Sequence, residues 1–251
     1  MFLSIKKNLT ADIILLRQKS AVVGAFWLSS LILLYILFSS STMLAVDKTG
    51  YYLRQACTTL TIINLFAVII VGAFLGSVDN ENRTYCIRLV NTTRVRLGVS
   101  RIILLIGTTL VFFIFHALLG ELMDVAAHSV ERNIRSLLLL VFVCWLVSFL
   151  WSSFAYLFAF VSGSFSVTTT FAVGVYFIES FLDRFMPRML LEFLPVWNQK
   201  NLLIECFPKQ EGVVAVVQQQ EGSFGRSLTM IIFYTALIQA CILIFGKRKQ
   251  Y

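Results

Sequence analysis

The chain has 251 residues, of which 58% are hydrophobic and only 14% are charged, and its formal net charge is +8. A soluble domain carries about a quarter charged residues, so this composition excludes an ordinary water-soluble globule and indicates that a bilayer is the solvent. The excess positive charge lies at the ends of apolar segments on one side of the predicted topology, and this distribution argues against a nucleic-acid partner.

The first 19 residues predict an amphipathic helix that lies in the membrane interface. The pattern is a set of apolar residues at spacings of three and four: Phe2, Ile5, Leu9, Ile13 and Leu16. The charged residues fall mostly on the other side of the helix: Lys6, Lys7, Asp12 and Lys19. Such a helix buries its apolar side among the lipids and places its lysines near anionic headgroups.

Six long apolar segments predict six transmembrane helices. A hydrocarbon core about 30 Å thick requires about 20 apolar residues in a helix. The first uncharged run spans the 26 residues from Ala21 to Val46, which is longer than the apolar part of a cleaved signal peptide, about 7–15 residues. The predicted spans are residues 21–43, 57–78, 102–120, 137–161, 165–182 and 227–246.

The fourth and fifth spans come from one segment, residues 136–178, which has no charged residue. As a single helix this segment would be about twice as long as the hydrocarbon core is thick, so the chain must turn back. The sequence Ser162-Gly163-Ser164 is the run of small residues within it where a turn fits, because glycine tolerates turn dihedrals.

The distribution of Lys and Arg predicts that both termini face the cytoplasm. With the N-terminus inside, the inner segments carry twelve cations against three acids, whereas the outer segments carry nine of each. Cytoplasmic loops are enriched in Lys and Arg, so this orientation is favoured over the reverse. The long outer segment, residues 183–226, is too apolar in its first half to float in water. It predicts short re-entrant helices in the outer leaflet, with Trp197 as an interfacial anchor.

The inner loop between the second and third spans, residues 79–101, has acidic residues first and basic residues last. Glu81 and Asp79 precede a short segment that fits about two helical turns, and arginines follow it up to Arg101, which is expected to open the third span. Acids at the start of a helix and cations at its end suit the helix dipole. This pattern predicts a short surface helix that presses against a cytoplasmic partner; the alternative is a solvated loop.

Two ionisable residues lie within the predicted spans and are therefore functional candidates. His116 is expected either to pack by one hydrogen bond to a neighbouring helix or to contact substrate or relay protons. Glu179 is either an interfacial carboxylate or a gating group. Gly72 and Gly76 form a GxxxG pair, which predicts a close helix contact, either within the chain or with a second copy.

The sequence gives little support for catalysis by this chain. A phosphate-binding GxxxxGK[ST] loop is absent, which argues against ATP hydrolysis here. Gly163-Ser164 lacks a suitable histidine for an intramembrane serine protease, and no cluster of His, Glu or Asp suits a metal. The five cysteines have no CxxC spacing and predict neither disulfides nor a metal site.

This architecture resembles the type-2 permeases of ABC transporters, exporter subunits of six spans. Their loop between spans two and three typically reads acidic, Gly-Thr, Pro-x-[ST]-Arg and then Lys. Residues here at similar positions are Glu81, Thr84, Thr93, Arg94 and Arg101, although Arg83 replaces the glycine and no proline precedes Thr93. The length and the lack of a large outer domain are similar to lantibiotic-immunity and peptide-export permeases.

The resemblance implies a transport subunit without cofactors of its own in a cell membrane of bacterial type. Two permease chains, identical or related, would dock on a cytoplasmic ABC ATPase dimer that binds ATP and Mg²⁺. The coupling residues would be Glu81, Arg83, Thr84, Arg88, Thr93 and Arg94. The segment 183–200 would shape the exit, and a pathway for apolar or amphipathic cargo would involve His116, Glu179, Phe112 and Phe158.

Three other functions remain open on the sequence. A secondary transporter or channel would work without ATP, although such proteins usually carry more buried charge than this chain shows. A non-transport membrane protein, such as an assembly factor or a sensor, would need no pathway at all. An intramembrane enzyme is the third alternative.

Overall fold

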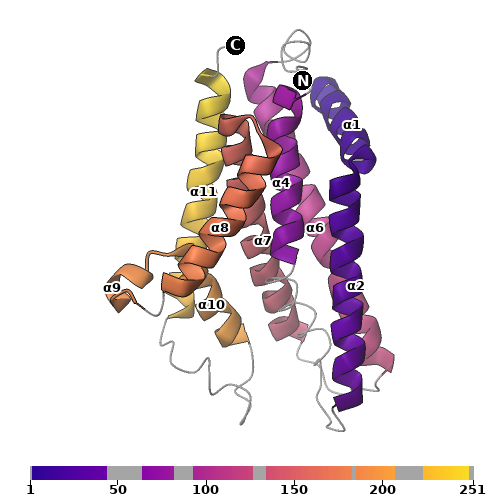
Figure 1. Cartoon of the computed structure of the whole chain (residues 1–251), viewed down its shortest axis with the longest axis vertical. Helices are drawn as coiled ribbons and strands as arrows, with labels where there is room; N and C mark the ends of the chain where they lie inside the picture. The colour runs from indigo at the N-terminus through magenta and orange to yellow at the C-terminus, as the bar shows by residue number, and fades with distance from the viewer. Residues whose placement is uncertain are drawn as a thin grey trace.

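The computed structural model describes residues 2–43, 64–81, 93–126, 134–182, 185–206 and 223–248, and helix is the only regular structure in these ranges. The helices in chain order are α1 (Phe2–Gln18), α2 (Ser20–Met43), α4 (Asn64–Glu81), α6 (Arg94–Ala126), α7 (Ile134–Ser162), α8 (Phe165–Leu182), α9 (Arg188–Leu191), α10 (Pro195–Cys206) and α11 (Phe224–Arg248). Figure 1 shows α1 and the end of α11 at one end of the bundle, and α9 and α10 toward the other. We call these the inner end and the outer end.

Five of these helices are long and apolar enough to cross a membrane: Ser20–Ser39, Val95–Ala126, Leu138–Ser162, Phe165–Leu182 and Phe224–Gly246. They fit the predicted all-α, multi-pass membrane protein. The remaining predicted span corresponds to α4, whose apolar stretch Leu65–Val78 is shorter. Residues 57–63, with which that span was predicted to begin, lie outside the described residues, so the sixth span stays a prediction.

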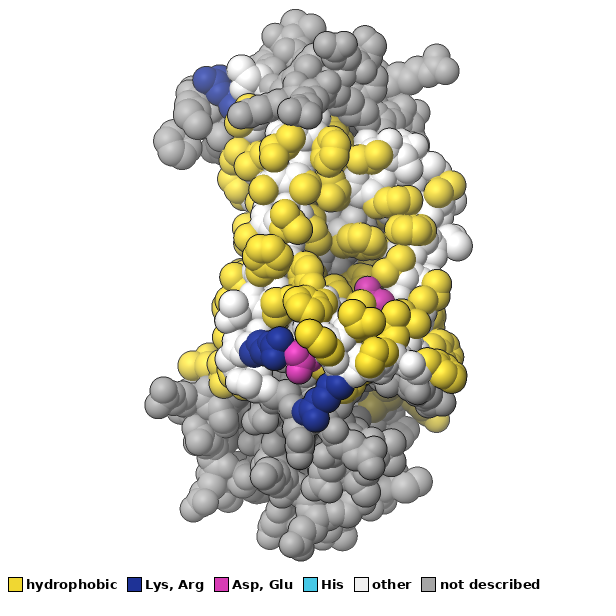
Figure 2. Space-filling model, turned by 90° about the vertical axis from the view of Figure 1, so that its left-hand side faces the viewer, with side chains coloured by type: hydrophobic (Ala, Val, Ile, Leu, Met, Phe, Trp, Pro, Cys, Tyr) yellow, Lys and Arg dark blue, Asp and Glu magenta, His cyan; other side chains and the backbone are white. Residues whose placement is uncertain are grey.

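Large apolar side chains cover the outside of the bundle. On α2, for example, Trp27, Leu31 and Tyr35 are all exposed. Figure 2 shows one face of the molecule, where hydrophobic side chains form a broad band and acidic and basic side chains gather toward the outer end. A water-soluble protein rarely exposes so much contiguous apolar surface, whereas lipid chains solvate it readily.

The turn between α7 and α8 is where the sequence predicted it. Helix α7 ends at Ser162 and α8 begins at Phe165, and Gly163 between them has a φ of 73°. This left-handed conformation is accessible to glycine without the steric penalty that a Cβ atom brings. The hydroxyl groups of Ser162 and Thr168, which lie 3.1 Å apart across the turn, hold the two helix ends together.

Helix α6 differs most from its predicted bounds, since it starts at Arg94 rather than at residue 102 and continues to Ala126. Thr93 caps its first turn, because the backbone N–H of Arg96 donates to Thr93 Oγ1 at 3.4 Å. Arg101, expected to open the helix, lies instead two turns inside it. The predicted inner loop 79–101 is therefore shortened at both ends, because α4 also continues through Glu81.

Helix α4 lies at the centre of the bundle, where eight successive residues from Val71 to Val78 are buried. Its GxxxG pair faces α7 of the same chain. A Cβ atom on Gly72 would overlap the carbonyl oxygen of Ser152, and one on Gly76 would overlap the carbonyl oxygen of Tyr156 and lie 2.7 Å from Cβ of Ala159. This glycine face is occupied within the chain and is not open to a second copy.

At the outer end, α10 packs among α7, α8 and α11. Its apolar residues Val196 and Leu202 are buried in two different core clusters. Between them, Gln199 accepts a hydrogen bond from the indole N–H of Trp151 on α7 at 3.1 Å. The predicted anchor Trp197 is half-buried on the same helix.

We predict that Gly76→Ala destabilises the chain by about 1–3 kcal/mol, because the new methyl group forces α4 away from α7. The matched control is Gly107→Ala on α6, where a Cβ atom meets nothing within 4 Å. This control is expected to be neutral or to stabilise by about 0.5–1 kcal/mol. Unfolding of the two variants in detergent micelles measures the difference, and equal stability would contradict the α4–α7 crossing.

Candidate functional site

A buried ion pair joins the interfacial helix to the bundle at the inner end. The Nε atom of Arg101 on α6 lies 3.0 Å from Oδ2 of Asp12 on α1, and the two side chains are 1% and 0% exposed. The Nη1 atom of Arg101 also donates to the backbone carbonyl of Leu75 on α4 at 3.0 Å. We call Asp12, Arg101 and the Leu75 carbonyl the inner clasp, because they connect three helices that are distant in sequence.

The inner clasp lies within an apolar cluster. Buried neighbours on the same three helices include Leu16, Val78 and Leu97. An isolated charge is very unfavourable in such surroundings, so each member of the pair depends on the other. Arginine suits this place because its fixed fork of donors serves a carboxylate and a carbonyl oxygen together.

The position of Asp12 corrects the predicted orientation of α1. Asp12 was assigned to the polar side, but it is fully buried against α6. One feature of the sequence could have indicated that Asp12 has a buried partner: it is the only acidic residue before Asp47. A lone acid in a basic segment is a reason to look for an arginine in a neighbouring helix.

Lys19 strengthens the same junction. It lies between α1 and α2, and its ammonium group is 5.4 Å from the ring centre of Phe74 on α4 and 5.7 Å from that of Phe165 on α8. A cation over an aromatic face is favourable, the more so where water is excluded. The start of α2 is thereby held against α4 and α8.

The predicted coupling residues that the structure describes lie at the ends of the two helices that carry Leu75 and Arg101. Glu81 is the last residue of α4, and Arg94 is the first residue of α6. Thr93 is exposed and serves as the cap of α6. Arg83, Thr84 and Arg88 lie outside the described residues. The clasp therefore fixes the two helices that lead into and out of residues 82–92.

His116 is buried between α2 and α6. Its Nδ1 atom lies 2.7 Å from the carbonyl oxygen of Phe112, so Nδ1 must carry the donated proton. Its Nε2 atom lies 3.0 Å from Oγ of Ser30 on α2, and the same hydroxyl donates to the carbonyl oxygen of Phe26 at 2.8 Å, so its single proton is shared between the two acceptors when the ring is neutral. The rings of Phe26, Phe112 and Phe115 surround the imidazole at centroid distances of 4.6–5.7 Å. This geometry suits the predicted packing role.

Glu179 caps a helix at the outer end. Its Oε2 atom accepts the backbone N–H of Val196 at 3.1 Å, in the first turn of α10. A carboxylate at this place satisfies an N–H that has no partner within the helix, and it also suits the helix dipole. Glu179 thus ties α8 to α10, a contact that sequence spacing alone does not indicate.

Of the four candidate pathway residues, the structure brings Phe112 and His116 into contact, with ring centres 4.6 Å apart. Phe112 is buried beside His116 and packs on Ala67 and Val68 of α4. Phe158 belongs to α7 and stacks on Phe171 of α8, with ring centres 4.2 Å apart. These contacts of Phe112 and Phe158 thus involve different helices, α4 and α6 for the first and α7 and α8 for the second.

Metal binding has no support in the part of the chain that the structure describes, since it contains no group of three or more His, Cys, Asp or Glu that could hold an ion. Cys144 and Cys241 are free cysteines.

Comparison with known proteins leaves the family open. No protein family matches this chain, and none of the curated proteins matches it in sequence.

We predict that Arg101→Met or Asp12→Leu alone destabilises the chain by about 3–5 kcal/mol, because each leaves one buried charge without its partner. The double variant removes both charges and is expected to recover most of that loss. The control is the exposed pair of Arg226 and Glu192, whose side chains are 57% and 30% exposed. The matching substitutions there should change stability by about 0–1 kcal/mol. Purely additive losses at Asp12 and Arg101 would contradict the clasp.

We also predict that His116 and Ser30 are energetically coupled. His116→Leu removes the imidazole that contacts the Ser30 hydroxyl, and Ser30→Ala removes the hydroxyl that contacts Nε2 of His116. In a double-mutant cycle the coupling should be about 0.5–1.5 kcal/mol, the usual net value of one hydrogen bond. A coupling of zero, measured by unfolding in the same micelles, would show that the two side chains do not bond in the folded protein.

Proposed function

We propose that this chain is the permease subunit of an ATP-driven ABC exporter that moves a hydrophobic or amphipathic cargo, such as a peptide or an antibiotic, out of a cell. The observation that carries the proposal is the inner clasp, which connects α1, α4 and α6 beside residues 82–92. A force applied to that loop by a cytoplasmic partner would reach three helices at once. An exporter permease driven by a separate ATPase needs such a connection.

The remaining architecture supports the same proposal. An interfacial N-terminal helix, apolar helices that alternate in direction and short helices at the outer end agree with the type-2 permease plan. Six spans and an N-in, C-in topology belong to the proposal and are supported by the excess of Lys and Arg on the inner segments. The re-entrant outer helices would be α9 and α10.

The proposed mechanism follows from these connections. Two ATPase subunits would bind and close on the inner end, and residues 82–92 would move with them. Because Arg101 bonds both Asp12 and the Leu75 carbonyl, α4 and α6 would tilt together and carry α1 along the interface. The tight α4–α7 crossing would pass this tilt to α7 and the outer end.

A second permease chain is part of the proposal, because the type-2 permease plan that this chain resembles places the pathway between two chains. Cargo would then travel between two copies, identical or related. The glycine face of α4 is already used inside the chain, so the contact between copies would involve other helices. The cell membrane is the proposed location.

The alternative is a secondary transporter or channel that works without ATP. Such a protein would use His116 or Glu179 to couple ion movement to transport. In the structure each of them makes a hydrogen bond that joins two helices, and they lie in different parts of the bundle. These bonds favour structural roles and make the alternative the weaker of the two.

Affinity purification of the tagged chain from gently solubilised native membranes tests the proposal. We expect a P-loop ATPase to co-purify in stoichiometric amount. In the purified complex, Glu81→Ala together with Arg94→Ala should remove most of the cargo-stimulated ATP hydrolysis, because both residues border the loop that meets the ATPase.

The control for this double variant is Glu192→Ala together with Arg226→Ala, which also removes one acid and one arginine but at the outer end. Its ATP hydrolysis should stay within about twofold of the parent, as expected for an exposed ion pair. If the chain purified without an ATPase and catalysed gradient-driven flux, the ABC proposal would be wrong and the alternative would replace it.

A further inference from the structure

The segment between α8 and α10 carries the most exposed apolar side chains among the described residues. We call residues 185–194, which include α9, the outer loop. Phe185 is 82% exposed and Met189 is 78% exposed, compared with 72% for Tyr35, the most exposed large apolar side chain on the long helices. Met186, Leu190 and Phe193 are exposed as well. Something apolar must cover this surface.

Many of the backbone N–H and C=O groups of the outer loop form hydrogen bonds within the protein, although the segment is mostly irregular. The N–H groups of Leu190 to Leu194 all donate to carbonyl groups between Pro187 and Leu191. The carbonyl of Phe193 accepts the hydroxyl of Tyr234, and those of Glu192 and Leu194 accept the amide of Asn198, each at 2.9 Å. A segment that contacts lipid needs such internal bonding, whereas a segment in water does not.

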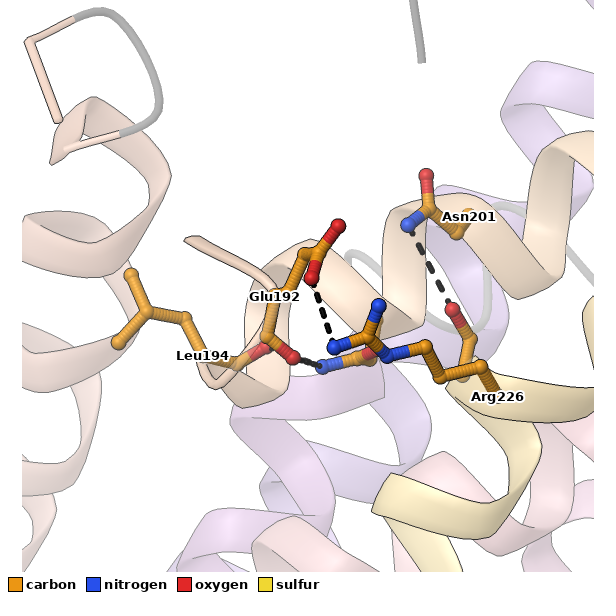
Figure 3. Close-up of polar contacts among 6 residues, drawn as sticks. Glu192, Leu194, Asn201 and Arg226 are labelled. Atoms are coloured by element: carbon orange, nitrogen blue, oxygen red, sulfur yellow. Dashed lines mark hydrogen bonds and ion pairs between the residues drawn. The ribbon is translucent and has the colours of Figure 1, made fainter. Parts of the chain in front are cut away.

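These bonds also hold the outer loop in one position. Figure 3 shows Arg226, in the first turn of α11, reaching Glu192 of the loop. The loop ends at Leu194, next to α10. Nη2 of Arg226 lies 2.7 Å from Oε2 of Glu192. Further along α11, the hydroxyl of Tyr234 donates a hydrogen bond to the carbonyl oxygen of Phe193 in the outer loop. The apolar side chains of the outer loop are therefore held in one position relative to α10 and α11.

The depth of the outer loop matches a leaflet rather than the aqueous phase. In Figure 1, α9 stands out sideways from the bundle near the end of α8, while α2 and α7 continue beyond that level. The apolar spans of those helices reach Ser39 on α2 and Leu138 on α7, each four residues from the helix end. A segment that projects sideways at this depth meets the outer leaflet.

Two arginines lie on the rim of this surface. Arg188 is exposed in the first turn of α9, and Arg226 is more than half exposed. Long arginine side chains place their stems against apolar groups and their guanidinium groups at the level of the headgroups, where they donate bidentate hydrogen bonds to phosphate. This arrangement of apolar surface and rim charge fits a phospholipid.

We propose that the outer loop is a lipid-binding surface inserted into the outer leaflet. Acyl chains of glycerophospholipids contact Phe185, Met186, Met189 and Phe193, and the phosphodiester group binds at Arg188. The proposal requires only that the chain spans a bilayer with α9 at its outer end. It is independent of whether the protein is an exporter.

Quenching of a tryptophan placed on the loop tests this proposal. Met189→Trp keeps a large apolar side chain at an exposed position, and its signal is the difference from the parent chain. The variant is reconstituted in vesicles of phosphatidylcholine that is either unmodified, brominated near the headgroup end of the acyl chains, or brominated near their terminal methyl groups. Iodide added to the same vesicles reports contact with water.

The positive control is Tyr35→Trp, on a lipid-facing position of α2. We expect Met189→Trp to lose a share of its fluorescence similar to that of the control in brominated lipid, more strongly with shallow than with deep bromine, and to be insensitive to iodide. Quenching by iodide alone would overturn the proposal and place the loop in water. Absence of both effects would also overturn it and show that protein covers the loop. Stronger quenching by deep bromine would contradict the headgroup contact of Arg188.

Discussion

The inner end is organised around the buried ion pair between Asp12 and Arg101. Neither charge is tolerable alone, because burial removes it from water without a replacement. Their contact seats α1 on α6, and the second bond of Arg101 to the Leu75 carbonyl adds α4.

The outer end is assembled by different chemistry. Capping and amide hydrogen bonds join the helices there. Glu179 caps α10, Trp151 bonds Gln199, and Asn198 bonds the outer loop. Between the two ends, α4 and α7 cross in direct backbone contact at Gly72 and Gly76. A displacement of α4 at the inner end must therefore move α7 or separate the two helices.

Local sequence features predicted much of this fold, because they depend on neighbouring residues. Long uncharged runs identified the apolar helices, and Gly163 located the α7–α8 turn to the residue. Helix α6 begins at Arg94, eight residues before the predicted third span, and the prediction missed this start because Arg94 and Arg96 were assigned to a loop by their charge alone. Neither Thr93 as a helix cap nor Asp12 as a distant partner is visible in a local window.

The candidate site was predicted less completely for the same physical reason. Helical periodicity indicates which residues share a face, but not which charge on one helix meets which charge on another. Asp12 was therefore placed on the polar side of α1, although it is buried against α6. Glu179 was expected to be either an interfacial carboxylate or a gating group, and its contact with the first turn of α10 was not foreseen. The contact of His116 with Ser30 on α2 agrees with the first of the two roles considered for it, packing against a neighbouring helix. Predictions for Arg83, Thr84 and Arg88 lie outside the described residues and remain predictions.

The central claim is that the inner clasp holds α1 on the bundle and links it to the helices beside residues 82–92. Hydrogen–deuterium exchange of the reconstituted chain, with and without Arg101→Met, measures this directly. The clasp predicts slow exchange in residues 2–18 of the parent and much faster exchange in the variant, with exchange in α11 unchanged. If α1 exchanged equally slowly without Arg101, its position would depend on lipid or on other contacts, and the clasp could not transmit movement from the inner loop.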